Sequence, residues 1–324
     1  MSRIVIDGFE GGDLSGWGNL GASVIVPSGP MGLRNAGCCQ LTYGSGITRN
    51  LPTPKSELYL HCRVLFADVR DGLTVTFFNN ANRLGWVLLQ GSAVPAAQLF
   101  GPGGTHGGGA LITGESVGLE IHYKPDSTAA GLFTVKLNGV VVADVAGIGT
   151  SDYTLPINNI TFTATTSFAH IHVDDFILDD AAWIGDAFVC GLFPSGAGVS
   201  AQFTPSAGSN YACVDESPAN DADWVATNTA DQIDFYAAGD LPAEAYSIKG
   251  IAVQARAAIT GTAVCAHLAL GIRPGTVAAF SGDQAVTHDS FGPVTGIWET
   301  NPDSSAPFTP AAINGMQIGL KSRV

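Results

Sequence analysis

The sequence has few charged residues and no long apolar run. Asp, Glu, Lys and Arg make up 13% of its 324 residues, about half the usual share. Its 14 Lys and Arg are scattered singly against 28 Asp and Glu, which argues against nucleic acid and anionic membranes as partners. No stretch approaches the roughly 18 apolar residues of a membrane span. The first residues lack the apolar run of a signal peptide, so we expect synthesis in the cytoplasm without export.

Cysteine occurs six times but never as Cys-x-x-Cys, the spacing typical of zinc sites. We therefore expect no zinc site. Cytoplasmic synthesis favours free, mostly buried thiols. Disulfide formation after release from the cell is the alternative.

Sequence signatures of catalysis are missing as well. Gly44–Gly46 spell Gly-Ser-Gly, but no helical pattern follows, as a nucleophile elbow requires. The run Gly101–Gly109 lacks the Lys-Ser/Thr ending of a phosphate-binding loop, and we interpret it as a plain loop. Among 28 acids some pair will always resemble a glycosidase pair. A solvated acidic surface is the simpler interpretation, and we expect that the chain is not an enzyme.

The sequence does contain alternation of apolar and polar residues with a period of two, the pattern of half-buried strands. Leu58–Phe66, Val117–Lys124 and Ile171–Leu178 show it. Asn138-Gly139 separates two strand-like runs and predicts a tight hairpin. With 41 Gly and 17 Pro and no long amphipathic helix, the chain is predicted to be all-β with very little helix.

The second half shows the same alternation. Strands are predicted at Ala187–Phe193, Tyr246–Ala257, Val264–Ile272 and Gln317–Lys321, and a single helical turn at Pro310–Gly315. A chain of this length is long enough to form two domains.

Asp179–Gly185 is the predicted domain boundary. Strands at this spacing suit antiparallel sandwiches. We therefore expect two antiparallel β-sandwich, jelly-roll-like domains, residues 1–180 and residues 186–324.

The first domain resembles a known superfamily at its two ends. FEGGDLSGW (Phe9–Trp17) and HVDDFILDD (His172–Asp180) are similar to the opening and closing segments of concanavalin-like and jelly-roll carbohydrate-binding domains. The hairpin KLNGVVVADV (Lys136–Val145) resembles the laminin-G-like sandwich. The resemblance implies a jelly roll whose first and last strands pair, often with a structural calcium ion where they meet.

Glu10 and Asp174 stand at the positions that match this calcium motif, with Asp7 and Asp175 nearby in sequence. The apolar positions are odd-numbered up to Val173 and even-numbered afterwards, which predicts a β-bulge at Asp174-Asp175. Calcium favours such carboxylate oxygens. The alternative is that these acids cap a strand end and face solvent. Apart from this possible structural calcium, no cofactor is expected.

A glycan site is conceivable around Trp86, with Asn82 and Arg83 as polar partners. Tryptophan is more often a core residue than a platform, so the structural interpretation stays open. His122, His170 and His172 could form a transition-metal site, although surface histidines are the simpler interpretation.

The second domain carries another resemblance. WIGDAFVCGLFPSG (Trp183–Gly196), AQFTPSAGSNYACVDESPANDADWVAT (Ala201–Thr227) and GIWETNPDSSAPFTPAAINGMQIGLK (Gly296–Lys321) are similar, in this order, to structural proteins of tailed bacteriophages. These are often described as tail-fibre-like or minor structural proteins. The resemblance implies a virion location and a non-catalytic role.

Together these features predict a bacteriophage virion protein made in the host cytoplasm, most simply a tail-associated, fibre-like or adhesin-like subunit with a role in assembly or host attachment. Expected partners are other virion proteins, further copies of itself in a homo-oligomer such as a trimer, and a host-surface glycan. A capsid-decorating or head-fibre protein and a carbohydrate-binding module are the alternatives.

Overall fold

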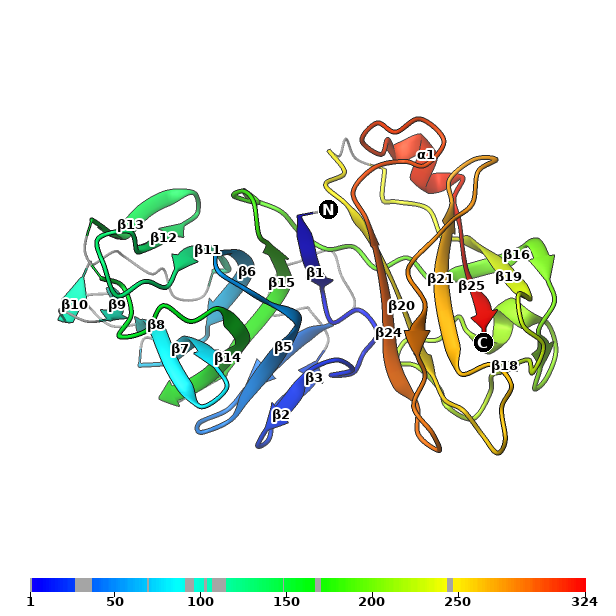
Figure 1. The fold of residues 1–324 in the computed structure, drawn as a ribbon, viewed down its shortest axis with the longest axis horizontal. Helices are drawn as coiled ribbons and strands as arrows, with labels where there is room; N and C mark the ends of the chain where they lie inside the picture. Colours follow the sequence, from blue (N-terminus) through cyan, green and yellow to red (C-terminus); the bar gives the residue numbers. More distant parts are fainter. Residues whose placement is uncertain are drawn as a thin grey trace. The chain divides into compact units, whose positions relative to one another are not determined.

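The computed structural model describes residues 2–26, 37–68, 70–90, 96–101, 104–106, 115–147, 149–166, 170–243 and 247–324. They divide into two compact units, Ser2–Val189 and Cys190–Val324. Both units are built from antiparallel strands (Figure 1), and helix is confined, in the described part, to α1 (Pro310–Asn314) and the 3-10 turn η2 (Asn210–Cys213). The predicted all-β class with antiparallel sandwiches and very little helix is confirmed.

None of the helical segments in the described ranges is long and apolar enough to cross a membrane.

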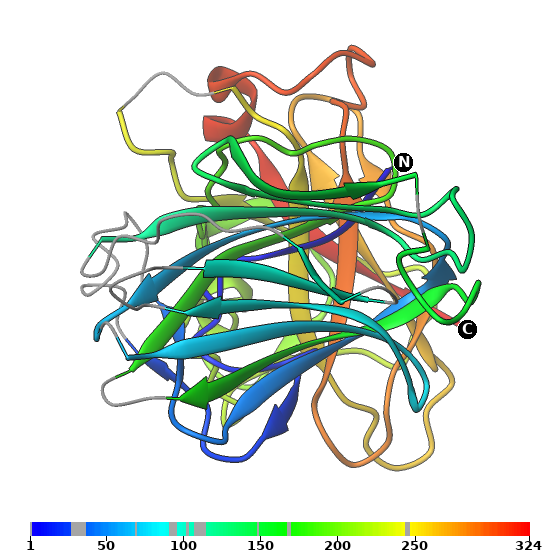
Figure 2. The ribbon, with the colours of Figure 1, turned by 90° about the vertical axis from the view of Figure 1, so that its left-hand side faces the viewer.

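The N-terminal unit is a sandwich of two antiparallel sheets, seen as two stacked layers in Figure 2. The eight-stranded sheet has the order β13-β12-β11-β6-β15-β4-β3, with β1 pairing to β15. Its strands are β1 (Arg3–Asp7), β3 (Val24–Val26), β4 (Cys38–Leu41), β6 (Leu58–Phe66), β11 (Val117–Lys124), β12 (Leu132–Leu137), β13 (Val140–Ala146) and β15 (Ile171–Asp179).

The seven-stranded sheet has the order β10-β9-β8-β7-β14-β5-β2. Its strands are β2 (Gly18–Leu20), β5 (Gly46–Lys55), β7 (Gly72–Asn79), β8 (Asn82–Gln90), β9 (Ala96–Gly101), β10 (Gly104–His106) and β14 (Ile157–Thr166). The predicted loop Gly101–Gly109 is thus wrong in part, since β10 lies inside it; residues 102–103 and 107–109 lie outside the described ranges.

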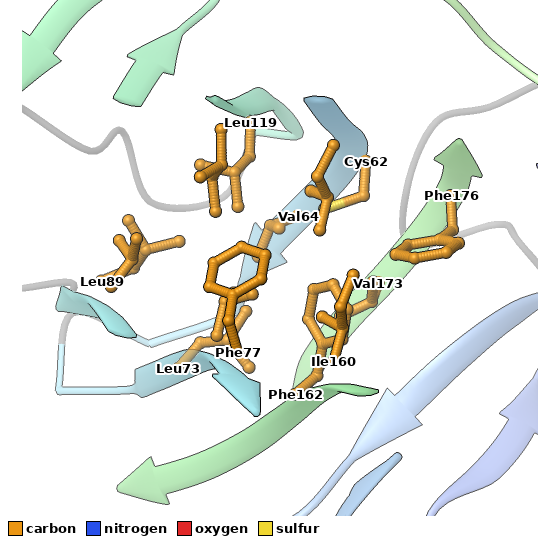
Figure 3. Close-up of a cluster of buried hydrophobic side chains, with 14 of the residues drawn as sticks. Cys62, Val64, Leu73, Phe77, Leu89, Leu119, Ile160, Phe162, Val173 and Phe176 are labelled. Atoms are coloured by element: carbon orange, nitrogen blue, oxygen red, sulfur yellow. The ribbon is translucent and has the colours of Figure 1, made fainter. Parts of the chain in front are cut away.

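Alternating apolar side chains from both sheets meet between the layers and form one core (Figure 3). Val64 and Leu119 come from the eight-stranded sheet, and Leu73, Phe77 and Phe162 come from the seven-stranded sheet. All five are at most 1% exposed. At about 25 cal/mol per Å² of apolar area removed from water, such burial is the main stabilising contribution to the unit.

Two local predictions in this unit are confirmed. Asn138 and Gly139 have φ values of 47° and 78° and join β12 to β13 with Leu137 opposite Val140, as a two-residue hairpin requires. The first and last strands of the unit, β1 and β15, pair antiparallel.

The C-terminal unit is built around a six-stranded sheet of order β16-β19-β25-β21-β22, with β23 also pairing to β21. The pair β20–β24 packs against it through a second apolar core that includes Val253, Leu270, Ile272, Val294 and Trp298. The strands are β16 (Pro194–Ala201), β17 (Thr204–Pro205), β18 (Val225–Ala226), β19 (Ile233–Ala238), β20 (Ile251–Ala257), β21 (His267–Arg273), β22 (Ala279–Phe280), β23 (Gln284–Ala285), β24 (Gly292–Trp298) and β25 (Gln317–Arg323).

The predicted strand Ala187–Phe193 is wrong. No strand is formed there, and β16 begins at Pro194. The physical reason is that backbone groups of this stretch bond to side chains of the eight-stranded sheet: the Val189 amide donates to Asp175, and the Ala187 carbonyl contacts the His61 ring. The alternation in the sequence is therefore not used for strand pairing.

Candidate functional site

Outward side chains of four neighbouring strands in the seven-stranded sheet form a polar surface, here called the open face. One row crosses it in register: Thr48 of β5, Thr161 of β14, Thr76 of β7 and Trp86 of β8. Each member has a strand neighbour that is fully buried in the core, so the alternation of strand side chains directs the row outward. Trp86 and Thr48 are half-buried, and the two central threonines are at most 9% exposed.

A hydrogen-bond network fixes one end of this row. The Asn159 Nδ2 donates to Asn50 Oδ1 at 2.7 Å and to Thr48 Oγ1 at 2.8 Å, and the Thr161 hydroxyl donates to Asn159 Oδ1 at 3.0 Å. The network spans β5 and β14 and stays within the sheet. It therefore presents hydroxyl and amide groups in a fixed arrangement.

The other end of the row carries two of the three residues proposed for a glycan. The Arg83 guanidinium lies over the Trp86 ring, 3.8 Å from its centroid, and a β-bulge between Phe77 and Phe78 in the β7–β8 pairing brings Arg83 to the same face as Trp86. Asn82 sits opposite Asn79 at the tip of the hairpin and, by alternation, points away from Arg83.

Sequence inspection missed the threonine and asparagine members of the open face. A signal was present, because β7 contains Leu-Thr-Val-Thr-Phe and β14 contains Ile-Thr-Phe-Thr-Ala, and within these stretches threonine occupies every outward position. What the sequence does not contain is the register that sets Thr48, Thr76 and Thr161 side by side.

The outer face of the eight-stranded sheet is covered instead. Residues 181–189, here called the crossing segment, lie across it. The Gly185 amide donates to Glu120 Oε1 at 2.8 Å, and His61 Nε2 lies 2.9 Å from the Ala187 carbonyl oxygen. Trp183 packs edge-on against the stacked rings of Tyr59 and His122. Glu120 is 4% and His61 0% exposed, so this sheet offers a ligand little polar surface there.

The residues proposed for calcium lie at an acidic corner formed by Asp7, Glu10, Asp174 and Asp175, where β1 meets β15. The predicted bulge is confirmed: the β15–β6 register shifts between Asp174 and Ile177, and Asp175 has a φ of 53°. The bulge turns two consecutive carboxyl groups inward, and both aspartates are 0% exposed. A residue at a β-bulge with a left-handed backbone conformation directs its side chain to a different side than regular alternation would.

Burial dominates the electrostatics of this corner. It raises the pKa of Asp174 to about 9, assisted by the neighbouring charges of Asp175, Glu10 and Asp7. It raises the pKa of Asp175 to about 6, opposed by the Val189 amide and by Arg63, whose Nε lies 3.8 Å from Asp175 Oδ2. Asp174 is therefore protonated at neutral pH.

The corner does not fit the implied calcium ion, which takes six to eight oxygen ligands. Both Asp7 oxygens are engaged, by the Phe9 amide at 2.9 Å and Trp17 Nε1 at 2.8 Å, and Asp175 Oδ1 accepts from Val189. Among the oxygens of these three aspartates, only Oδ2 of Asp174 and Oδ2 of Asp175 have no hydrogen bond. Within the described ranges no three His, Cys, Asp or Glu side chains are placed to hold a metal ion.

The cysteines follow the simpler interpretation where the structure describes them. All six cysteines are free, and burial raises the pKa of Cys38, beside Asp174, to about 12. The expectation of surface histidines is wrong for His122 and His172, which are 8% and 4% exposed, whereas His170 is exposed. His122 bonds to Glu57 at 2.6 Å and stacks on Tyr59, whereas His172 contacts Gln40 at 3.3 Å. The structure therefore does not bring the three proposed histidines together.

No protein-family model matches the sequence, and no curated protein matches it. Solved structures do resemble it. An endo-β-1,4-glucuronan lyase from the fungus Trichoderma reesei matches with a TM-score of 0.44 and 11% identity over 56% of this chain and 96% of its own. A sialidase matches with a TM-score of 0.40 and 12% identity over 56% of this chain, but the match spans only 18% of the sialidase. Domain 4 of an extracellular arabinanase from Geobacillus stearothermophilus, in complex with arabinotriose, matches with a TM-score of 0.39 and 14% identity. The match covers 56% of this chain and 94% of that domain.

These names correct the expectation that the chain is not an enzyme. The glucuronan lyase is an enzyme that is matched over nearly its whole length, whereas the sialidase is matched over only 18% of its own chain. A missing sequence signature therefore does not exclude catalysis in this fold, and that expectation is wrong. At identities of 11–14% the likeness concerns the fold alone.

Proposed function

We propose that the N-terminal unit binds saccharides on its open face. The observation that carries this proposal is the in-register row of Thr48, Thr161, Thr76 and Trp86 with its bonded asparagines. Sugar hydroxyls both donate and accept hydrogen bonds, as do threonine hydroxyls and asparagine amides. An indole offers an apolar surface with a polar edge, the combination that suits a sugar ring.

The dimensions of the row favour an oligosaccharide over a monosaccharide. Neighbouring strands lie about 4.8 Å apart, so four strands give a row about 14 Å long. Because Asn159 is already held by Thr48, Asn50 and Thr161, its amide loses little conformational freedom on binding. A preorganised polar surface of this kind supports binding of an extended chain.

Trp86→Ala is expected to weaken binding of a recognised oligosaccharide at least tenfold. Removing an aromatic anchor costs roughly 2 kcal/mol, and 1.4 kcal/mol is a factor of ten in Kd. A glycan array followed by isothermal titration calorimetry of the best ligand measures this. The same solutions are assayed for new reducing ends and for ultraviolet-absorbing unsaturated products, so that cleavage is detected alongside binding.

The matched control is Trp224→Ala, which removes an exposed indole from the C-terminal unit. This variant should bind like the unaltered protein. Equal losses in both variants, or no binding to any array member, would contradict the assignment of the open face.

We also propose that the protein is a virion subunit, tail-associated in the first instance, with capsid decoration as the alternative. The support is the resemblance of residues 172–324 to structural proteins of tailed bacteriophages, together with a charged-residue content of only 13%. On this proposal the open face would contact a host-surface glycan, and other virion proteins and further copies of the chain would be the partners. Gold-labelled antibody on purified particles tests it; labelling of neither head nor tail would refute it.

A further inference from the structure

The charge of the two sheets in the N-terminal unit is markedly unequal. In the chain, Asp and Glu outnumber Lys and Arg 28 to 14. Yet the strands of the seven-stranded sheet, four of which form the open face, contain no Asp or Glu, and their basic residues are Arg49, Lys55 and Arg83. The strands of the other sheet contain six acids: Asp7, Glu120, Asp144, Asp174, Asp175 and Asp179.

Arg83 differs from most arginines of the chain in its partner. Several others pair with aspartates: Arg3 with Asp179, Arg63 with Asp186, Arg70 with Asp68, Arg256 with Asp221, and Arg323 with Asp283. Within the described part, Arg83 has no ion pair, and its Cζ instead lies over the Trp86 ring, 3.8 Å from the ring centroid. A guanidinium that contacts an aromatic ring and no carboxylate keeps N–H groups available for a second partner.

We propose that the open face selects an acidic saccharide, with Arg83 binding its carboxylate or sulfate group. This inference rests on the saccharide-binding function proposed above and names its ligand class. Arg83 supplies a planar pair of donors that matches a carboxylate in a bidentate arrangement. Because its strands lack acids, the sheet does not repel an anionic chain lying along the row from Trp86 to Thr48.

The same observations favour a saccharide over a nucleic acid. Nucleic-acid surfaces carry several Lys and Arg in a stripe that follows the phosphates. Among the residues that the structure describes, Arg83 is the one cation shown in contact with Trp86, and the rest of the row consists of threonine hydroxyls with the bonded asparagine amides beside them. Such a surface suits a chain of hydroxyl-rich rings that carries carboxyl groups.

The test compares two oligosaccharide series with one backbone, β-1,4-linked glucose and β-1,4-linked glucuronate, on the full-length protein by calorimetry. The glucuronate series is expected to bind at least tenfold more tightly in about 50 mM salt, and the preference should shrink in about 500 mM salt, where charges are screened within about 4–5 Å. Arg83→Gln should abolish the preference while leaving the weaker binding of the glucose series in place. Arg256→Gln, which removes an arginine of the C-terminal unit, should keep the preference.

Each other outcome decides against the inference in a distinguishable way. Equal or tighter binding of the glucose series would overturn the acidic ligand and leave saccharide binding intact. Binding of neither series, or tighter binding of a single-stranded oligonucleotide, would overturn both proposals. Loss of both series in Arg83→Gln would show that Arg83 maintains the surface without selecting charge; unchanged melting of that variant establishes that it is folded.

Discussion

Asp174→Asn is expected to stabilise the N-terminal unit near pH 8, by roughly 2 kcal/mol or more. In the folded protein the pKa of Asp174 is about 9, whereas an unfolded aspartate titrates near pH 4. Between these values the folded state holds a proton that the unfolded state has released, so stability falls as pH rises, by up to about 1.4 kcal/mol per pH unit. Asparagine has the same shape, still accepts from the Asp175 amide, and is never charged.

The expected gain corresponds to roughly 5 °C in melting temperature, measured by scanning calorimetry at several pH values. It should shrink to a few tenths of a kcal/mol near pH 4 and vanish below about pH 3, where the aspartate is protonated in both states. The control is Asp152→Asn, which changes an exposed aspartate of the same unit and should leave the profile unaltered. A variant that melts lower at all pH values, together with melting raised by added calcium in the unaltered protein, would show that the ionised corner binds a cation.

Asp234→Ala is expected to destabilise the C-terminal unit by about 3–5 kcal/mol, because it removes four hydrogen bonds to one buried carboxylate. Asp234 is 0% exposed. Its oxygens accept from the amides of Gln202 and Phe203, from Asn210 Nδ2 at 2.6 Å and from the Tyr236 hydroxyl at 3.0 Å. Alanine would leave the buried Phe203 amide and Tyr236 hydroxyl without this acceptor, while Asn210 Nδ2 would keep its bond to the Phe203 carbonyl. The calorimetric transition of this unit should fall by roughly 10 °C or more.

Two further variants sharpen this experiment. Tyr236→Phe removes one of the four donors and should cost only about 1 kcal/mol. Asp240→Ala removes an exposed aspartate two residues beyond the same strand and should be neutral. If Asp234→Ala were no worse than Tyr236→Phe, the carboxylate would not be the organising contact between β19 and the chain at Gln202–Phe203.

Much of the fold of the N-terminal unit could be predicted because its strands bury one face. Alternation alone identified Leu58–Phe66 and Val117–Lys124 with the bounds that the structure shows for β6 and β11. The parity change around Asp174 predicted a bulge that the register shift confirms. These successes are local: each depends on the residues of one strand and their burial.

The features that the sequence did not predict correctly share a different cause: they depend on contacts between segments that are distant in sequence. Ala187–Phe193 alternates like a strand, yet its partners are side chains of β6 and β15 and not another backbone. The open face depends on the register of β5, β14, β7 and β8, and that register brings residues 48, 76, 86 and 161 together. A single sequence does not contain that pairing. The candidate site could therefore be anticipated only at Trp86 and Arg83, which neighbour each other along β8.

The crossing segment also determines where the N-terminal unit ends as an autonomous folding unit. A fragment that stopped at Asp180, the boundary the sequence indicated, would lack the Gly185 amide, the Ala187 carbonyl and the Val189 amide. Glu120, His61 and Asp175 would then lose these hydrogen-bond partners, and the outer face of the eight-stranded sheet would be exposed to water. A fragment that continues through Val189 keeps them, so the nine residues of the crossing segment, which form no strand, shield the polar groups on the outer face of the eight-stranded sheet.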